Sequence, residues 1–90
     1  MEDQSDLTTS ERAYLYATIN TLEDNIPQAI RHFIDAVRLQ PDNAQWRYEL
    51  AVLLQRQGLL EQARKQAAQA MRLAPDNATY RSLHAKLSGQ

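Results

Sequence analysis

Histidine and carboxylate side chains are the groups in this 90-residue chain that could support acid–base or metal chemistry. His32 has Asp35 three residues later, but one imidazole and one carboxylate do not complete a metal site. His84 is accompanied by no nucleophile and no third orienting group. Glu23 and Asp24 are adjacent, which is typical of solvated turn and cap residues. The sequence therefore predicts no catalytic residue, no metal site and no cofactor, and so no enzyme.

Cysteine, glycine and net charge exclude further classes of chemistry. The chain has no cysteine, which removes disulfides and thiolate catalysis, and only two glycines, which leaves no glycine-rich phosphate loop. Residues 1–24 carry six acidic side chains and one basic one, whereas residues 25–90 carry nine basic and five acidic ones. The second part is too weakly basic for a typical nucleic-acid surface, so a nucleic-acid partner is not expected.

Hydropathy gives no sign of a membrane segment. No apolar run approaches the ~20 residues that span a bilayer. Residues 1–10 are acidic and polar, unlike a signal or transit peptide. Alanine, leucine and glutamine dominate the composition, and all three favour helix. We expect a helical cytoplasmic protein without a membrane partner.

One segment recurs at a fixed offset. Residues 41–47, PDNAQWR, return as residues 75–81, PDNATYR, with five of seven positions identical and an aromatic replacing an aromatic. The same 34-residue offset relates Ala17 to Ala51 and Ala85. An offset shared by so many positions indicates an internal repeat.

Small and apolar residues keep the same spacing in both units. The second unit has Leu50, Ala51, Leu54, Gly58, Leu60, Ala63, Ala67, Ala70 and Pro75, and the first has Tyr16, Ala17, Ile26, Ala29, Phe33, Ala36 and Pro41. This 34-residue pattern resembles the tetratricopeptide repeat (TPR) family, with about two and a half repeats over residues 8–88. Asp24 stands where the family usually has glycine. The resemblance implies an all-α fold, an α-α superhelix (a TPR solenoid) of five antiparallel helices.

Cap and breaker residues predict where these helices begin and end. The capping box Thr8-x-x-Glu11 starts the first helix, Asn25 can cap the second and Asp42 starts the third. Gly58 is expected to end the third helix in a left-handed conformation. The helices are expected over about 9–22, up to 39, from 42 to 58, over about 60–73, and from 76 or 77 to just before 89.

Packing and the repeat offset divide the chain. Alanines are expected where paired helices approach most closely, at Ala17, Ala29, Ala36, Ala51, Ala63 and Ala70. Larger side chains should fill the core: Phe33, Trp46, Leu50, Leu54, Leu60, Met71 and Leu73. The expected parts are an acidic tail (1–7), a first repeat (8–40), a second repeat (41–74) and a C-terminal capping helix (75–90). Tyr80, Leu83 and Leu87 give that last helix one apolar face, so the array is expected to end there.

The resemblance, with the offset, also implies a concave groove whose wall is made by the first helix of each pair. Its expected residues are Glu11, Tyr14, Thr18, Leu22, Gln45, Tyr48, Val52, Gln55, Arg56, Thr79, Ser82 and Lys86. Tyr14 and Tyr48 are the best candidate anchors, because tyrosine combines apolar area with a polar tip. The leading hypothesis is a non-enzymatic adaptor or scaffold that binds a peptide or helix of a partner protein in this groove.

An apolar stripe on the first helix supports an alternative. Leu15, Ile19 and Leu22 are spaced i, i+4 and i+7, whereas the residues 34 places after Leu15 and Leu22 are Glu49 and Arg56. The stripe either folds partly into the groove, or faces a tail segment, or forms an interface with a partner. The alternative function is a self-associating structural subunit, a homo-oligomer joined through this stripe.

Overall fold

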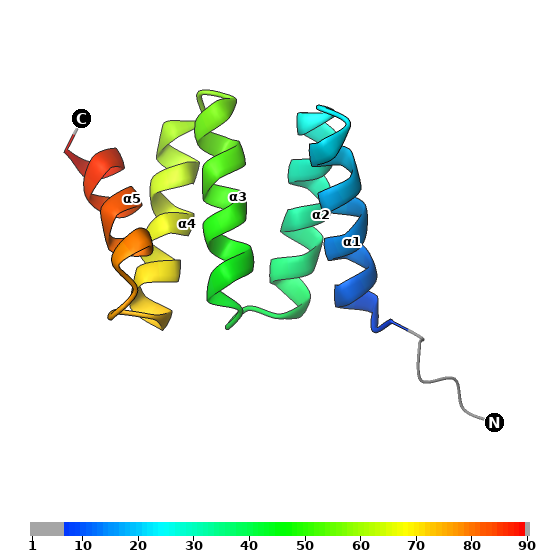
Figure 1. Ribbon diagram of the computed structural model, residues 1–90, viewed down its shortest axis with the longest axis horizontal. Helices are drawn as coiled ribbons and strands as arrows, with labels where there is room; N and C mark the ends of the chain where they lie inside the picture. The colour runs from blue at the N-terminus through cyan, green and yellow to red at the C-terminus, as the bar shows by residue number, and fades with distance from the viewer. Residues whose placement is uncertain (1–6, 90) are drawn as a thin grey trace.

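The computed structural model describes residues 7–89, and within them all regular secondary structure is α-helical. The described residues form five helices, which lie side by side from α1 at one end of the array to α5 at the other (Figure 1). The all-α prediction is confirmed, while residues 1–6 of the predicted acidic tail lie outside the described range. The helices are α1 (Thr9–Leu22), α2 (Ile26–Leu39), α3 (Ala44–Arg56), α4 (Leu60–Leu73) and α5 (Ala78–Ser88).

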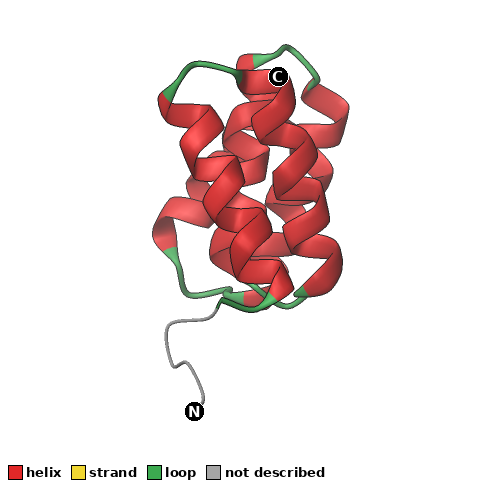
Figure 2. Cartoon of the chain, turned by 90° about the vertical axis from the view of Figure 1, so that its right-hand side faces the viewer, coloured by secondary structure: helices red, strands yellow, loops and turns green. Residues whose placement is uncertain are grey.

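The helices pack as antiparallel hairpins, α1 with α2 and α3 with α4, and α5 packs against α4 (Figures 1 and 2). Alanine is the residue that lets two helix axes come close, because its side chain is a single methyl group. The six alanines expected at these contacts are all fully buried, as predicted: Ala17, Ala29, Ala36, Ala51, Ala63 and Ala70, each 0% exposed.

Successive hairpins are joined by an aromatic contact that repeats with the sequence. The ring of Tyr14 in α1 stacks on Trp46 in α3, with centroids 4.8 Å apart. Thirty-four residues later, the ring of Tyr48 in α3 lies 5.0 Å from Tyr80 in α5. The first helix of each unit therefore contacts the first helix of the next. Trp46 is buried, which confirms its predicted place in the core.

Short polar side chains begin three of the helices. The capping box of α1 is present as predicted: Glu11 N donates to Thr8 Oγ1 at 3.1 Å, and Thr8 N donates to Glu11 Oε1 at 3.0 Å. Asparagine caps α3 and α5, through Asn43 and Asn77, each at 3.0 Å from the backbone N–H three residues later. The expected start at Asp42 was wrong by one residue, because the amide of Asn43 accepts that bond.

The second helix differs from its prediction at its start. Asn25 occupies the cap position but makes no capping hydrogen bond; its Nδ2 instead donates to Asn20 Oδ1 at 3.3 Å. Pro27 explains this in part, since it occupies the second helical position and has no N–H to donate. The turns that precede α2 and α4 are equivalent, because Asp24 has φ +60° and Gly58 has φ +79°. The expected left-handed end at Gly58 is confirmed.

Three predicted core residues lie outside the core: Met71 and Leu73 are half-buried, and Leu60 is exposed. Leu60 is 46% exposed, whereas Ile26, its equivalent 34 residues earlier, is 5% exposed. The last helix is shorter, which accounts for the difference: α5 stops at Ser88, the equivalent of Leu54, while α3 continues to Arg56. Less of a following helix is thus available to cover the start of α4. Within residues 7–89, no helix has both the length and the apolar character needed to cross a membrane.

Candidate functional site

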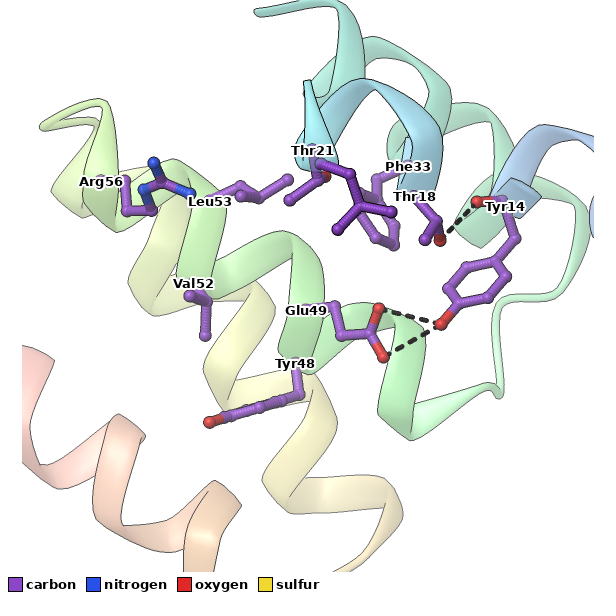
Figure 3. A pocket seen from close by; sticks show the side chains of 10 residues that line it. Tyr14, Thr18, Thr21, Phe33, Tyr48, Glu49, Val52, Leu53 and Arg56 are labelled. Atoms are coloured by element: carbon purple, nitrogen blue, oxygen red, sulfur yellow. Dashed lines mark hydrogen bonds between the residues drawn. The ribbon is translucent and has the colours of Figure 1, made fainter. Parts of the chain in front are cut away.

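A pocket of about 320 Å³ opens between α1 and α3, above a side chain of α2 (Figure 3). Its volume lies at the lower end of the range of pockets that bind small ligands. Apolar and aromatic groups make up most of its surface, with one carboxylate and one guanidinium among them. The lining residues are Tyr14, Thr18, Thr21, Leu22, Phe33, Tyr48, Glu49, Val52, Leu53 and Arg56.

Helical spacing explains why these side chains meet. Tyr14, Thr18 and Thr21 follow one another at i, i+4 and i+7 along α1, so they share one face. Residues of α3 repeat the pattern, with Tyr48 and Val52 four residues apart. Two helices that each turn one such face toward the other enclose the space between them.

A carboxylate organises the α3 side of the pocket. The hydroxyl of Tyr14 donates to both oxygens of Glu49, at 3.1 and 3.2 Å (Figure 3). Gln45 Nε2 also donates to Glu49 Oε2, at 2.8 Å. Thr18 Oγ1 donates to the backbone oxygen of Tyr14 at 3.0 Å. These bonds link α1 to α3 and leave the carboxylate of Glu49 half-buried at the pocket wall.

Burial and the carboxylate both act on the neighbouring phenols. Burial raises the pKa of Tyr14 above its ordinary value, and the charge and hydrogen bond of Glu49 raise it further. Burial also raises the pKa of Tyr80, with smaller contributions from Glu49 and Tyr48. Both phenols are therefore neutral near pH 7, and the hydroxyl of Tyr14 remains a hydrogen-bond donor.

A guanidinium lies at another part of the rim. Arg56 Nη2 is 3.3 Å from Asp24 Oδ1, which ties the end of α3 to the turn between α1 and α2. Both side chains are well exposed, so the pair is screened by water and contributes little to stability. Arg56 or Asp24 can therefore leave this pair for a charged group of a ligand at a small cost in free energy.

The repeated helices and the α3 wall of the pocket match a known family. A family model described as tetratricopeptide repeat covers residues 21–87. The chain belongs to the tetratricopeptide repeat family. Such repeats generally mediate protein–protein interactions, and the family is typically a non-enzymatic interaction module. The match starts at the end of α1, so most of the opposite wall of the pocket lies outside it. A search of curated proteins gave no match to this chain.

The structure gathers half of the groove residues expected from the TPR resemblance. Those that line the pocket are Tyr14, Thr18, Leu22, Tyr48, Val52 and Arg56. The others lie outside the lining: Glu11 caps α1, Gln45 supports Glu49, Gln55 is half-buried on α3, and Thr79, Ser82 and Lys86 are exposed on α5. The alternative interface residues Leu15 and Ile19 also lie outside it.

Four lining residues were not expected in the groove: Thr21, Phe33, Glu49 and Leu53. Phe33 is buried, which confirms its predicted place in the core, but it also lines the pocket. A signal for Glu49 existed in the repeat. The equivalent residues 34 places before and after it are Leu15 and Leu83, so a carboxylate at this place departs from the apolar pattern.

Neither histidine lines the pocket. The ring of His32 is tilted against Tyr16, with centroids 5.5 Å apart, and His84 Nε2 lies 3.3 Å from Ser88 Oγ. Across the part of the chain that the structure describes, no three His, Cys, Asp or Glu side chains are grouped closely enough to hold a metal ion.

Proposed function

We propose that this TPR protein binds a segment of a partner protein along α1 and α3, with one apolar side chain of that segment in the pocket. The pocket carries the proposal: it is open to solvent, largely apolar, and placed where two successive first helices face each other. An open apolar hollow in a solvated surface is favourable for a large side chain to enter, because entry removes apolar area from water.

Polar groups around the pocket would orient the segment. Glu49 can accept N–H groups of the partner, since a carboxylate has more acceptor sites than its two neighbours use. Arg56 can turn from Asp24 to a carboxylate of the partner. Tyr14 and Tyr48 supply the flat aromatic walls expected of anchor residues. We further propose that the exposed residues Thr79, Ser82 and Lys86 of α5 extend the contact, while α3 remains its centre.

Peptide selection with two matched variants tests the proposal. A library of random 12-residue peptides displayed on phage is selected on the wild-type chain, and the selected peptides are then measured by fluorescence anisotropy. Val52→Glu places a charge in the pocket lining, and Ile34→Glu places the same charge on an exposed apolar residue of α2 outside the lining. We expect selected peptides to share a large apolar residue, and to bind Val52→Glu at least tenfold more weakly than Ile34→Glu.

Circular dichroism of both variants checks that they fold. The proposal is wrong if peptides bind the two variants equally, since the bound surface would then lie elsewhere. It is equally contradicted if selection returns no sequence that binds the free chain.

A further inference from the structure

The outer face of α1 carries an apolar stripe, Leu15, Ile19 and Leu22, that lies mostly outside the proposed peptide site. Leu15 is 43% exposed, Ile19 is 41% exposed and Leu22 is 81% exposed. Only Leu22 also touches the pocket. Figure 2 looks onto the end of the array that holds this helix. Large aliphatic side chains in water at adjacent turns of one helix form a surface that is stabilised by being covered.

The repeat shows what normally covers this face. The residues 34 places later on α3 are Glu49, Leu53 and Arg56. Each of them either bonds to the preceding hairpin or is buried. Glu49 receives the hydroxyl of Tyr14, Arg56 pairs with Asp24, and Leu53 is 4% exposed. The stripe of α1 thus occupies the place where α3 is covered by the unit before it.

We propose that the stripe is covered by a second copy of the chain, with the two α1 helices antiparallel about a two-fold axis. The charges beside the stripe favour this arrangement. Arg12 and Glu23 are both exposed, and Glu23 follows Arg12 by 11 positions, about three helical turns, so they flank the stripe on the same side. In an antiparallel pair, Arg12 of each copy comes level with Glu23 of the other, and the two contacts form at once.

The opposite end of the array fits the stripe less well. A head-to-tail assembly would place α1 against the outer face of α5, where Ser82, Ala85 and Lys86 are exposed. Apart from the methyl groups of Ala78 and Ala85 that face is polar, so leucine side chains would gain little by meeting it. The self-complementary arrangement buries leucine against leucine and pairs opposite charges at both ends.

Charge reversal tests the register of the pair. The full chain is studied by sedimentation equilibrium over micromolar to millimolar concentrations. Arg12→Glu and Glu23→Arg should each weaken the dimer at least fivefold, because each places like charges together twice. The double variant, and an equimolar mixture of the two single variants, should both return to the wild-type dissociation constant, since every contact again joins opposite charges.

Two aliphatic substitutions complete the test. Leu15→Asp should leave a monomer, whereas Ile34→Asp, on an exposed residue of α2, should leave the dimer unchanged; circular dichroism checks both folds. A wild-type chain that is monomeric throughout overturns the proposal, as does a dimer that the double variant does not restore. A chain that dimerises only after removal of residues 1–6 also overturns it, because that segment would then be what covers the stripe.

Discussion

The two junctions between successive first helices have the same backbone plan and different chemistry. At the first junction the rings of Tyr14 and Trp46 are almost parallel, at 9°, with centroids 4.8 Å apart. At the second, the rings of Tyr48 and Tyr80 lie at 31° and 5.0 Å. Both junctions therefore have an aromatic contact. In both, an asparagine caps the helix that carries the second ring: Asn43 before Trp46 and Asn77 before Tyr80.

The residues around the two contacts do not repeat. Glu49, which receives the hydroxyl of Tyr14, is replaced 34 places later by Leu83, and Phe33 is replaced by Ala67. The pocket lies at the first junction, where these unrepeated side chains are. The repeat thus positions the helices, while residues that depart from it form the candidate site.

Removing one aromatic ring from each junction should change the free energy of unfolding most, and by clearly different amounts at the two junctions. Trp46 is 8% exposed and Tyr80 is only half-buried on the last helix. We expect Trp46→Ala to lower the free energy of unfolding by about 3–5 kcal/mol. Tyr80→Ala should lower it by about 1–2 kcal/mol, in the range of ordinary substitutions. Urea denaturation followed by circular dichroism measures both.

Tyr16→Ala serves as the control for this pair, since Tyr16 is 48% exposed on α1. Its effect should stay within about 0.5 kcal/mol. Equal losses of unfolding free energy in Trp46→Ala and Tyr80→Ala would contradict this prediction. They would mean that the second junction stabilises the array as much as the first, although its ring is less buried.

Most of the fold could be predicted because local signals agree with the repeat. The capping box, the left-handed turn at Gly58 and the buried alanines each depend on residues close in sequence or on a shared offset. Leu60 could not be predicted in the same way. Its exposure depends on how far α5 extends beside it, and the offset treats every unit as complete.

The site was predictable only in part for the same reason. The offset places groove residues on α1, α3 and α5 alike, but a pocket depends on side-chain size and charge at each junction. Phe33 illustrates the limit: its spacing marks a core residue, and it is both buried and part of the pocket. Whether a buried ring also borders an opening is set by tertiary packing.

The hydrogen bond between Tyr14 and Glu49 should make the stability of the first junction depend on pH. The pKa of Tyr14 is raised above its ordinary 10.0 in the folded chain, first by burial and then by Glu49. A group with a raised pKa stabilises the fold below its unfolded value, and the contribution is lost as pH rises through the folded value. We expect Tyr14→Phe to cost about 1–2 kcal/mol at pH 8, with the difference from wild type shrinking above pH ~10.

Tyr48→Phe is the matched control, because Leu83 stands at the place equivalent to Glu49 and gives Tyr48 no carboxylate there. Its cost at pH 8 should be about 0.5 kcal/mol or less. A cost for Tyr14→Phe that stays constant from pH 8 to pH 11 would contradict the role assigned to this phenol. Denaturation in urea at each pH provides the measurement.

The smallest effects should come from the two equivalent turns, where the backbone repeats and the side chain does not. Asp24 has φ +60° and Gly58 has φ +79°, a region in which glycine is favoured over residues with a Cβ. A Cβ at Gly58 would meet no atom within 4 Å, so Gly58→Ala isolates the backbone cost, about 1 kcal/mol. Asp24→Gly removes that cost but also the exposed pair with Arg56, and the two changes offset to within about 0.5 kcal/mol.

Thermal unfolding of both variants tests whether the turns are equivalent. A loss of stability in Asp24→Gly as large as that in Gly58→Ala would mean that the pair with Arg56 holds the first junction together.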